Sequence, residues 1–222
     1  PLAPWPPGWT FTLALDSLHG QGGWKGWYNN PAAAATTTSS QALSAPNSVD
    51  ITGASDLVHE FSGYTSGTWR LSASQYIPTG FNGQSYFILL NAYSDLGVGN
   101  NWSTQVRFDS STNQIVNEYE GDSLNLIFDQ WVELLVIIDL DNDEQTFYYG
   151  GQELFRKSWT DGVSGSGAFN IAALDLFANE STSIYYDNIS LGSSAVPEPA
   201  TIALLALGLA GIGAVRRKKP VA

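Results

Sequence analysis

Three carboxylates alternate in the segment EYEGD, where Glu118, Glu120 and Asp122 are separated by single residues. On a β-strand this spacing places all three on one face, the arrangement that a glycosidase needs for its acid and its nucleophile. Gly121 and the turn chemistry around it indicate a solvated strand end instead. We therefore predict no catalytic residues in this segment, and glycoside hydrolysis is only a remote alternative.

Other catalytic arrangements have less support. His19 and His59 are far apart in the sequence and neither stands beside a nucleophile motif, so a Ser-His-Asp triad is not predicted. The chain contains no Cys, which excludes Cys nucleophiles, thiolate metal sites and disulfides. We predict that the protein is not an enzyme.

The segment DLDND has the alternating acids of a calcium-binding loop, namely Asp139, Asp141 and Asp143. Glu144 stands where such a loop requires Gly, and the bidentate Glu expected later in the loop is absent. A hairpin turn is predicted here.

A second acid stands inside an apolar strand pattern. On a regular strand, Asp187 of SIYYDNISL shares a face with Tyr185, Ile189 and Leu191. A buried carboxylate needs a cation or several hydrogen-bond donors. The sequence leaves open a structural Ca²⁺ and a hydrogen-bonded structural aspartate.

Aromatic residues are numerous, with eight Trp and ten Tyr. Their flat faces stack on sugar rings while neighbouring polar side chains bind hydroxyl groups. The candidate carbohydrate-binding residues, in a Gly-rich segment or beside strand ends, are Trp24, Trp27, Tyr28, Trp69 and Trp102. The alternative, that these rings fill the protein core, is the favoured interpretation for the group and more strongly so for Trp131, which begins an apolar strand.

The net charge of −12 limits the possible partners. Nucleic-acid binding depends on Lys and Arg contacts to phosphates, so no nucleic-acid partner is predicted. Anionic polysaccharides would be repelled as well, unless a divalent cation bridged the two molecules.

The elements that must position these residues are predicted to be strands. Short apolar runs alternate with Gly, Asn, Asp and Ser clusters over residues 10–191, a pattern typical of an all-β jelly-roll sandwich. The predicted strands cover 10–16, 48–51, 57–61, 68–77, 85–93, 103–108, 131–140, 145–149, 169–177 and 183–191. Because the run 131–140 is apolar on both faces, we expect a central strand covered on both sides.

The two ends of the chain differ from this pattern. Residues 1–9 hold four prolines and are predicted to form an extended arm. Pro1, where an initiator Met is expected, indicates that an export signal has been removed. Residues 192–199 are predicted to be a linker, 200–215 a transmembrane helix and 216–222 a basic tail. The helix would be about 24 Å long, shorter than a roughly 30 Å hydrocarbon core, so it would be a weak anchor.

The C-terminal segment resembles a known sorting signal. Val196, Pro197, Glu198 and Pro199 precede the apolar segment, and the basic run 216–219 follows it. These three parts in this order resemble the PEP-CTERM sorting tag of Gram-negative bacteria. The resemblance implies processing by an exosortase near the Pro-Glu-Pro motif and association with an exopolysaccharide or biofilm matrix. The positive-inside rule places the basic tail in the cytoplasm and the β-domain outside.

The β-domain resembles concanavalin A-like (laminin-G-like) jelly rolls over residues 10–191. The resemblance is based on the segments ALDSLHGQGGWKGWYNNPAAAAT, SAPNSVDITGASDLVHEF, QWVELLVIIDLDND and IYYDNISL. In related jelly rolls an acid of the final strand and an acid near the first strand hold a structural Ca²⁺. The resemblance therefore implies Asp16 and Asp187 as candidate calcium ligands.

The leading functional prediction is a non-enzymatic exported protein of the cell surface or extracellular matrix. Its predicted partners are an exosortase, an extracellular polysaccharide or matrix and, transiently, the bacterial inner membrane. One alternative is a lectin-like carbohydrate-binding module. Another is a self-assembling surface fibre or matrix subunit, in which the arm 1–9 docks on a neighbouring copy.

Overall fold

The computed structural model describes residues 17–194 of the chain. Several predictions lie outside the described residues: the arm 1–9, the strand 10–16, Asp16, the motif 196–199, the helix 200–215 and the tail 216–222. Within 17–194, none of the helical segments has the length and apolar character needed to cross a membrane.

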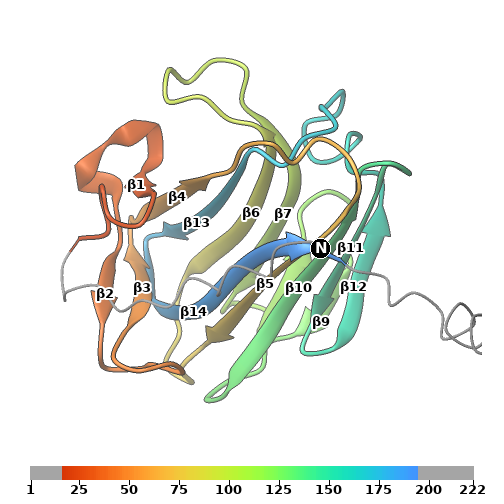
Figure 1. Cartoon of the computed structure of the whole chain (residues 1–222). Coiled ribbons are helices and arrows are strands. Elements are labelled where there is room, and N and C mark those ends of the chain that lie inside the picture. The colour runs from red at the N-terminus through yellow and green to blue at the C-terminus, as the bar shows by residue number, and fades with distance from the viewer. Residues whose placement is uncertain (1–16, 195–222) are drawn as a thin grey trace, which may run out of the picture.

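Two antiparallel seven-stranded sheets stack face to face, as Figure 1 shows. The first sheet has the order β1 (Trp24–Gly26), β4 (Asp56–Glu60), β13 (Ala173–Asn179), β6 (Gln84–Ala92), β7 (Asn101–Asp109), β8 (Gln114–Asn117) and β9 (Ser123–Asn125). The second has the order β12 (Gln152–Lys157), β11 (Glu144–Tyr149), β10 (Trp131–Asp139), β5 (Thr68–Tyr76), β14 (Ser181–Ser193), β3 (Ser48–Gly53) and β2 (Thr36–Thr38). Two 3₁₀ turns, η1 (Trp27–Asn29) and η2 (Pro31–Ala33), follow β1. This jelly-roll-like sandwich confirms the all-β prediction.

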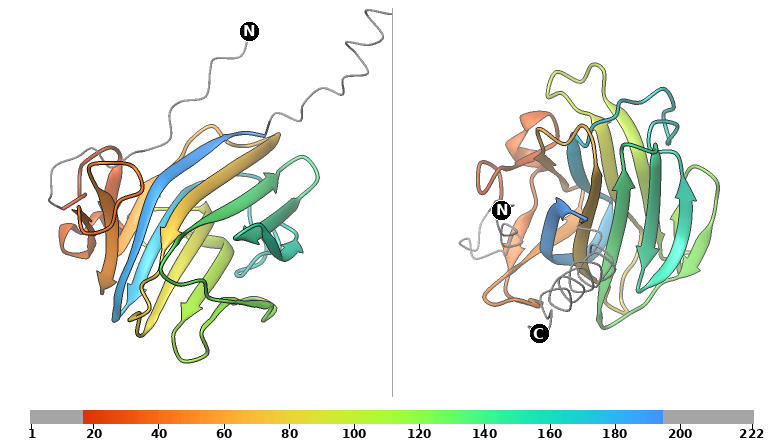
Figure 2. Two further views of the ribbon diagram at one scale, coloured as in Figure 1. Left: turned by 90° about the horizontal axis from the view of Figure 1, so that it is seen from below. Right: turned by 45° about the vertical axis from the view of Figure 1, so that its right-hand side comes forward.

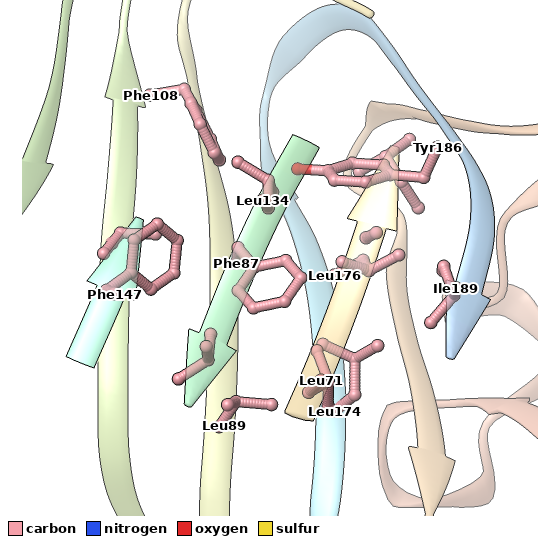
Figure 3. Close-up of a cluster of buried hydrophobic side chains, with 14 of the residues drawn as sticks. Leu71, Phe87, Leu89, Phe108, Leu134, Phe147, Leu174, Leu176, Tyr186 and Ile189 are labelled. Carbon is pink, nitrogen blue, oxygen red and sulfur yellow. The ribbon is translucent and has the colours of Figure 1, made fainter. Parts of the chain in front are cut away.

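The core lies between the sheets because alternate residues of each strand point inward. Figure 3 shows rings and aliphatic side chains of both sheets meeting there, including Phe87, Phe147, Leu134 and Tyr186. The Tyr186 hydroxyl accepts a 2.8 Å hydrogen bond from Gln75 Nε2, so this buried polar group is satisfied.

The prediction for the apolar strand 131–140 is half right. β10 is central, between β5 and β11. Its inward residues are buried, but Glu133 is exposed and Leu135 and Ile137 are only partly buried. The strand is therefore covered on one side. The outward aliphatic residues pack beside longer amphipathic side chains, since Leu135 pairs with Tyr148 across the sheet.

Strand limits differ from the prediction in a few places. β14 continues through Gly192 and Ser193, which are predicted as linker. Five short strands, β1, β2, β8, β9 and β12, have no predicted counterpart. These strands lie at or near the ends of the two sheets, where a few residues with little apolar patterning are enough to pair.

Candidate functional site

The first sheet has a second apolar cluster on the face that points away from the core, which we call the outer face. Its buried members are Val58, Ile88, Leu90 and Ala173, and its partly buried members are Trp27, Tyr86, Tyr93, Trp102 and Phe177. The outward face of a sandwich sheet is usually polar. A face with this many large rings therefore suggests a binding surface.

Four rings gather around Trp27 at one end of the outer face, and we call Trp27, Tyr28, Tyr93 and Trp102 the aromatic cluster. The Trp27 ring centroid lies 5.0 Å from Tyr28, 5.0 Å from Tyr93 and 6.2 Å from Trp102, and the two indoles are stacked at 29°. Trp27 and Tyr28 belong to η1, Tyr93 directly follows β6, and Trp102 lies on β7. The Tyr28 side chain is the most open, at 47% exposed.

A tight reversal after β1 positions Trp27 and Tyr28. A side chain on Gly26 would meet the Asn30 carbonyl oxygen at 2.0 Å, so only glycine fits where the chain turns back. Tyr28 has a positive φ of 55° and its N–H donates to the Tyr93 hydroxyl at 3.1 Å. The left-handed backbone is thus fixed by a contact to another member of the aromatic cluster.

Tyr93 links this turn to the β6–β7 loop. Its hydroxyl donates to Asp95 Oδ1 at 3.0 Å. Burial is the main cause that raises the pKa of Tyr93 far above its usual value, and the neighbouring Asp95 adds to it. Tyr93 therefore remains a protonated hydrogen-bond donor over the whole physiological range.

Lys25 joins the same elements by charge. Its Nζ pairs with Glu60 and, at 2.5 Å, with Asp95, and it lies 5.3 Å from the centroid of the Tyr93 ring. Burial lowers the pKa of Lys25, but the hydrogen bonds to Asp95 and Glu60 outweigh it and the pKa is raised overall. Lys25 is therefore charged and fixes β1 against β4 and the β6–β7 loop.

The β12–β13 loop supports Trp102 from the other side. Ser164 N–H donates to the Trp102 carbonyl oxygen at 3.2 Å, and Asn101 Nδ2 donates to the Gly165 carbonyl oxygen at 3.0 Å. Gly162 packs so closely on β7 that a Cβ would lie 2.4 Å from the Ser103 carbonyl oxygen. The β6–β7 and β12–β13 loops lie at the same end of the sandwich in Figure 1 and in the right-hand view of Figure 2.

The structure brings together some of the sequence-predicted aromatic residues and separates others. Trp27, Tyr28 and Trp102 meet in the aromatic cluster. Trp24 is only 2% exposed and packs edge-on against His59 in the core, so it offers no face to a sugar and the core-filling alternative is correct for it. Trp69 lies on β5 of the second sheet, against Tyr64, and is not part of the cluster.

For Trp131 the structure corrects the prediction that the ring fills the core. It is only partly buried, and its neighbour Val132 points into the core instead. The Trp131 ring lies on the outward face of the second sheet, 5.6 Å from Tyr76. It is therefore not a core residue, because the alternation of the strand turns it outward.

Two aspartates form a pair on the outer face that the sequence analysis missed. Asp175 of β13 lies directly between Val58 and Ile88, and Asp56 of β4 lies opposite Phe177. The carboxyls of Asp56 and Asp175 lie close enough to shift each other's pKa, and the Oδ1 atom of each is buried without a hydrogen-bond partner. Asp175 is only 3% exposed. A signal was present, because Asp175 is the only acid within the apolar run FNIAALDLF.

Burial is the main cause that raises the pKa of both carboxyls. For Asp175 the nearby Asp56 raises the pKa further, well above its usual range. Two neighbouring carboxyls repel each other when both are ionised. The pair therefore holds its last proton to a higher pH than two separate carboxyls would.

Asp187 is buried for a different reason than its strand pattern suggests. Asn188 has a positive φ of 49° and the pairing of β14 with β5 shifts register between Asp187 and Ser190. Because of this bulge Asp187 does not share a face with Ile189 and Leu191, so that expectation is wrong. The segment before β3 covers Asp187 instead.

The Asp187 carboxylate accepts four hydrogen bonds from that segment and from its own strand. The donors are Leu43 N–H at 2.9 Å, Ser44 N–H at 2.7 Å, Ser44 Oγ at 2.6 Å and Asn188 N–H at 2.7 Å. Among residues 17–194 no group of three His, Cys, Asp or Glu side chains has the arrangement of a metal site. The predicted partner Asp16 is outside the described residues, so the calcium hypothesis stays a prediction.

The two acidic segments form turns. Glu118 and Glu120 lie in the turn after β8, where Glu118 forms an ion pair with Arg107, so the three carboxylates do not line one strand face. In the β10–β11 hairpin, Asp139 Oδ1 accepts 3.1 Å hydrogen bonds from the N–H groups of Asp141 and Asn142. The hairpin prediction for this segment is confirmed.

Residues 195–218 match the family model described as the PEP-CTERM protein-sorting motif, which confirms the resemblance of the C-terminal segment. The motif implies export, transient anchoring in the membrane and processing by an exosortase. No curated protein matches the chain in sequence.

Solved structures match the β-domain by shape. A sialidase matches with a TM-score of 0.52 and 8% identity, over 82% of this chain and 18% of that chain. A Trypanosoma rangeli sialidase in complex with 2,3-difluoro-KDN matches with a TM-score of 0.51 and 13% identity, over 71% and 26%. The carbohydrate-binding module CBM66 from Bacillus subtilis matches at 0.47 and 13% identity, over 77% and 96%.

This chain thus spans only a small part of the sialidases' length. At such identities the likeness shows the fold alone. The protein is a jelly-roll-like β-sandwich followed by a PEP-CTERM sorting motif.

Proposed function

We propose that residues 17–194 form a non-catalytic glycan-binding module of an exported protein that acts at the cell surface or in the extracellular matrix. The observation that supports this most is the aromatic cluster, in which four rings from three separate segments meet on an outward sheet face. This is the lectin-like alternative of the sequence analysis, joined to the export that the sorting motif implies.

The aromatic cluster has properties that sugar binding requires. The rings are held by their packing on one another and by the Tyr28–Tyr93–Asp95 hydrogen bonds, so little entropy would be lost when a sugar stacks on them. The partly exposed Tyr28 provides an apolar face, and Asp95 provides acceptors for hydroxyl groups nearby.

Two arrangements of carboxylates support binding without hydrolysis. Glu118 and Glu120 lie in a turn, and Asp56 and Asp175 lie on the adjacent strands β4 and β13 with Asp175 almost completely buried. Retaining glycosidases hold their two carboxyls about 5 to 5.5 Å apart and inverting enzymes hold them about 6.5 to 9.5 Å apart. Asp175 is only 3% exposed, so this pair does not present two open carboxyls on either side of a glycosidic bond.

Anchoring and binding would act together. Weak sites that engage one polymer gain avidity when many copies of the exported protein are displayed together. Retention in an exopolysaccharide or biofilm matrix therefore needs only modest affinity at each copy. The predicted self-association through residues 1–9 concerns a segment outside the described residues and stays a prediction.

The test is retention of the full chain, in mild detergent, on a panel of immobilised polysaccharides. Trp27→Ala and Trp102→Ala should each weaken retention at least about tenfold, because each removes a ring of the cluster. Trp131→Ala is the matched control, since it removes a partly exposed Trp from the other sheet. Equal loss in all three variants, or unchanged retention in the first two, would reject the proposal.

A further inference from the structure

The Asp56–Asp175 pair lies within the outer face and is surrounded by apolar and aromatic side chains. Asp175 has Val58 and Ile88 directly beside it on the neighbouring strands, and Phe177 is opposite Asp56. Phe177 and Tyr86 are stacked, with centroids 5.6 Å apart at 25°. The immediate neighbours of the pair on this face are therefore apolar or aromatic.

Among the described residues, the two carboxyls are not fully hydrogen-bonded. One buried oxygen on each carboxyl has no hydrogen-bond donor, and Asp175 is almost completely buried. The basic residues described on this face are engaged elsewhere, Lys25 by Glu60 and Asp95, and Arg107 by Asp109 and Glu118. A buried acceptor without a donor costs stability. Groups that cost stability without a structural partner are typical of binding sites.

We propose that this pair binds the protonated amine of an amino sugar, so that the glycan held by the outer face is a polysaccharide with free amino groups. The inference rests on the proposed function and names its substrate class. An ammonium group has three N–H donors and one positive charge, which match two carboxyls with unpaired oxygens. Asp56 is only partly buried and provides the approach from solvent.

Three further features favour an ammonium group on a sugar. The stacked Phe177 and Tyr86 rings beside Asp56 attract cations through their faces and sugar rings through their apolar surface. The net charge of −12 attracts a cationic polymer and repels an anionic one. A divalent metal is disfavoured, because within residues 17–194 no third acidic or imidazole side chain joins the pair.

The acid pair and the aromatic cluster can serve one ligand. Ala173 is two residues from Asp175 along β13, a distance of about 7 Å. Across the sheet, Ala173 pairs with Leu90 of β6, and Leu90 pairs with Trp102 of β7. The pair and the indole of Trp102 therefore face the same side of one sheet. A short oligosaccharide that stacks on the aromatic cluster therefore reaches the Asp56–Asp175 pair with its neighbouring sugar units.

The experiment compares two polymers that differ only in the amine. The full chain is titrated with chitosan oligomers and with fully N-acetylated oligomers of the same length, in a mildly acidic buffer that keeps the amines charged. We expect at least about tenfold tighter binding of the amine form. Asp56→Asn and Asp175→Asn should each abolish that preference, whereas Glu153→Gln, an equal loss of charge on the exposed β12 edge, should leave it unchanged.

The outcomes separate this inference from the proposed function. Equal affinity for the two oligomers, with both lost in Trp27→Ala, would reject the amine and retain glycan binding. Binding of neither oligomer would reject the inference, and the polysaccharide panel would then decide on glycan binding. Loss of the preference on addition of a chelator would reject the amine in favour of a bound metal. Circular dichroism of both Asn variants verifies that they are folded.

Discussion

At the scale of single residues, the same residue type has different roles in different surroundings. Asp187 and Asp175 are both buried acids on strands, yet the first accepts four hydrogen bonds and the second has an oxygen without a hydrogen-bond partner. Sequence predicted that Asp187 needs partners but not which ones, because the donors at Leu43 and Ser44 come from a distant segment. The apolar run around Asp175 gave a signal for a buried acid, but its pairing with Asp56 was unpredictable because the two residues are brought together only by strand order.

The acid pair should make stability depend on pH in a defined direction. Burial raises the folded-state pKa of Asp175 above its unfolded value, so its contribution to stability is full at pH values below the unfolded pKa and is lost as pH rises. Asp175→Asn cannot ionise and avoids that loss.

We therefore expect Asp175→Asn to gain about 1 to 3 kcal/mol in unfolding free energy over the native chain near neutral pH, and little near pH 3. Urea titrations at both pH values measure this difference. A variant that is less stable at neutral pH would mean that the carboxyl is satisfied in the folded protein.

At the scale of elements, the sandwich strands were largely predictable and the loops were not. Long segments that alternate apolar and polar residues, such as the one that forms β5, can be predicted as strands from that alternation. The outward turn of Trp131 and the bulge at Asn188 depend on register, and a one-residue shift moves a side chain to the other face. Tyr93 was missed because nothing in its local sequence shows that the β6–β7 loop lies against η1.

The bulge in β14 provides a test at this scale. Asp187→Ala removes the acceptor for the N–H groups of Leu43 and Ser44 and leaves those donors unsatisfied. We expect a loss of about 2 to 4 kcal/mol in unfolding free energy, with faster hydrogen exchange over residues 39–47. Asp187→Asn, which keeps one acceptor oxygen, should lose less.

A chelator gives the complementary test of the calcium hypothesis. The Asp187 carboxylate already accepts four hydrogen bonds. We therefore expect removal of calcium to leave the melting temperature unchanged. A clear decrease would instead support an ion held with Asp16.

At the scale of the whole molecule, a sorting motif follows the β-sandwich for which we propose glycan binding. The motif at 195–218 implies delivery across the membrane and release by an exosortase. Expressed with its exosortase, the protein should lose everything beyond about Pro199. Intact-mass measurement of the surface or medium protein determines this, and a mass that still includes the basic run 216–219 would contradict it.

The central claim, that the aromatic cluster binds glycan, is tested most directly by the indole N–H signals of ¹⁵N-labelled protein during a glycan titration. We predict that the Trp27 and Trp102 signals shift together and saturate at one affinity. The signals of buried Trp24 and Trp159 should not move, because both rings lie in the core. Shifts confined to Trp69 or Trp131, or no shift at all in the presence of retained glycan, would contradict the claim.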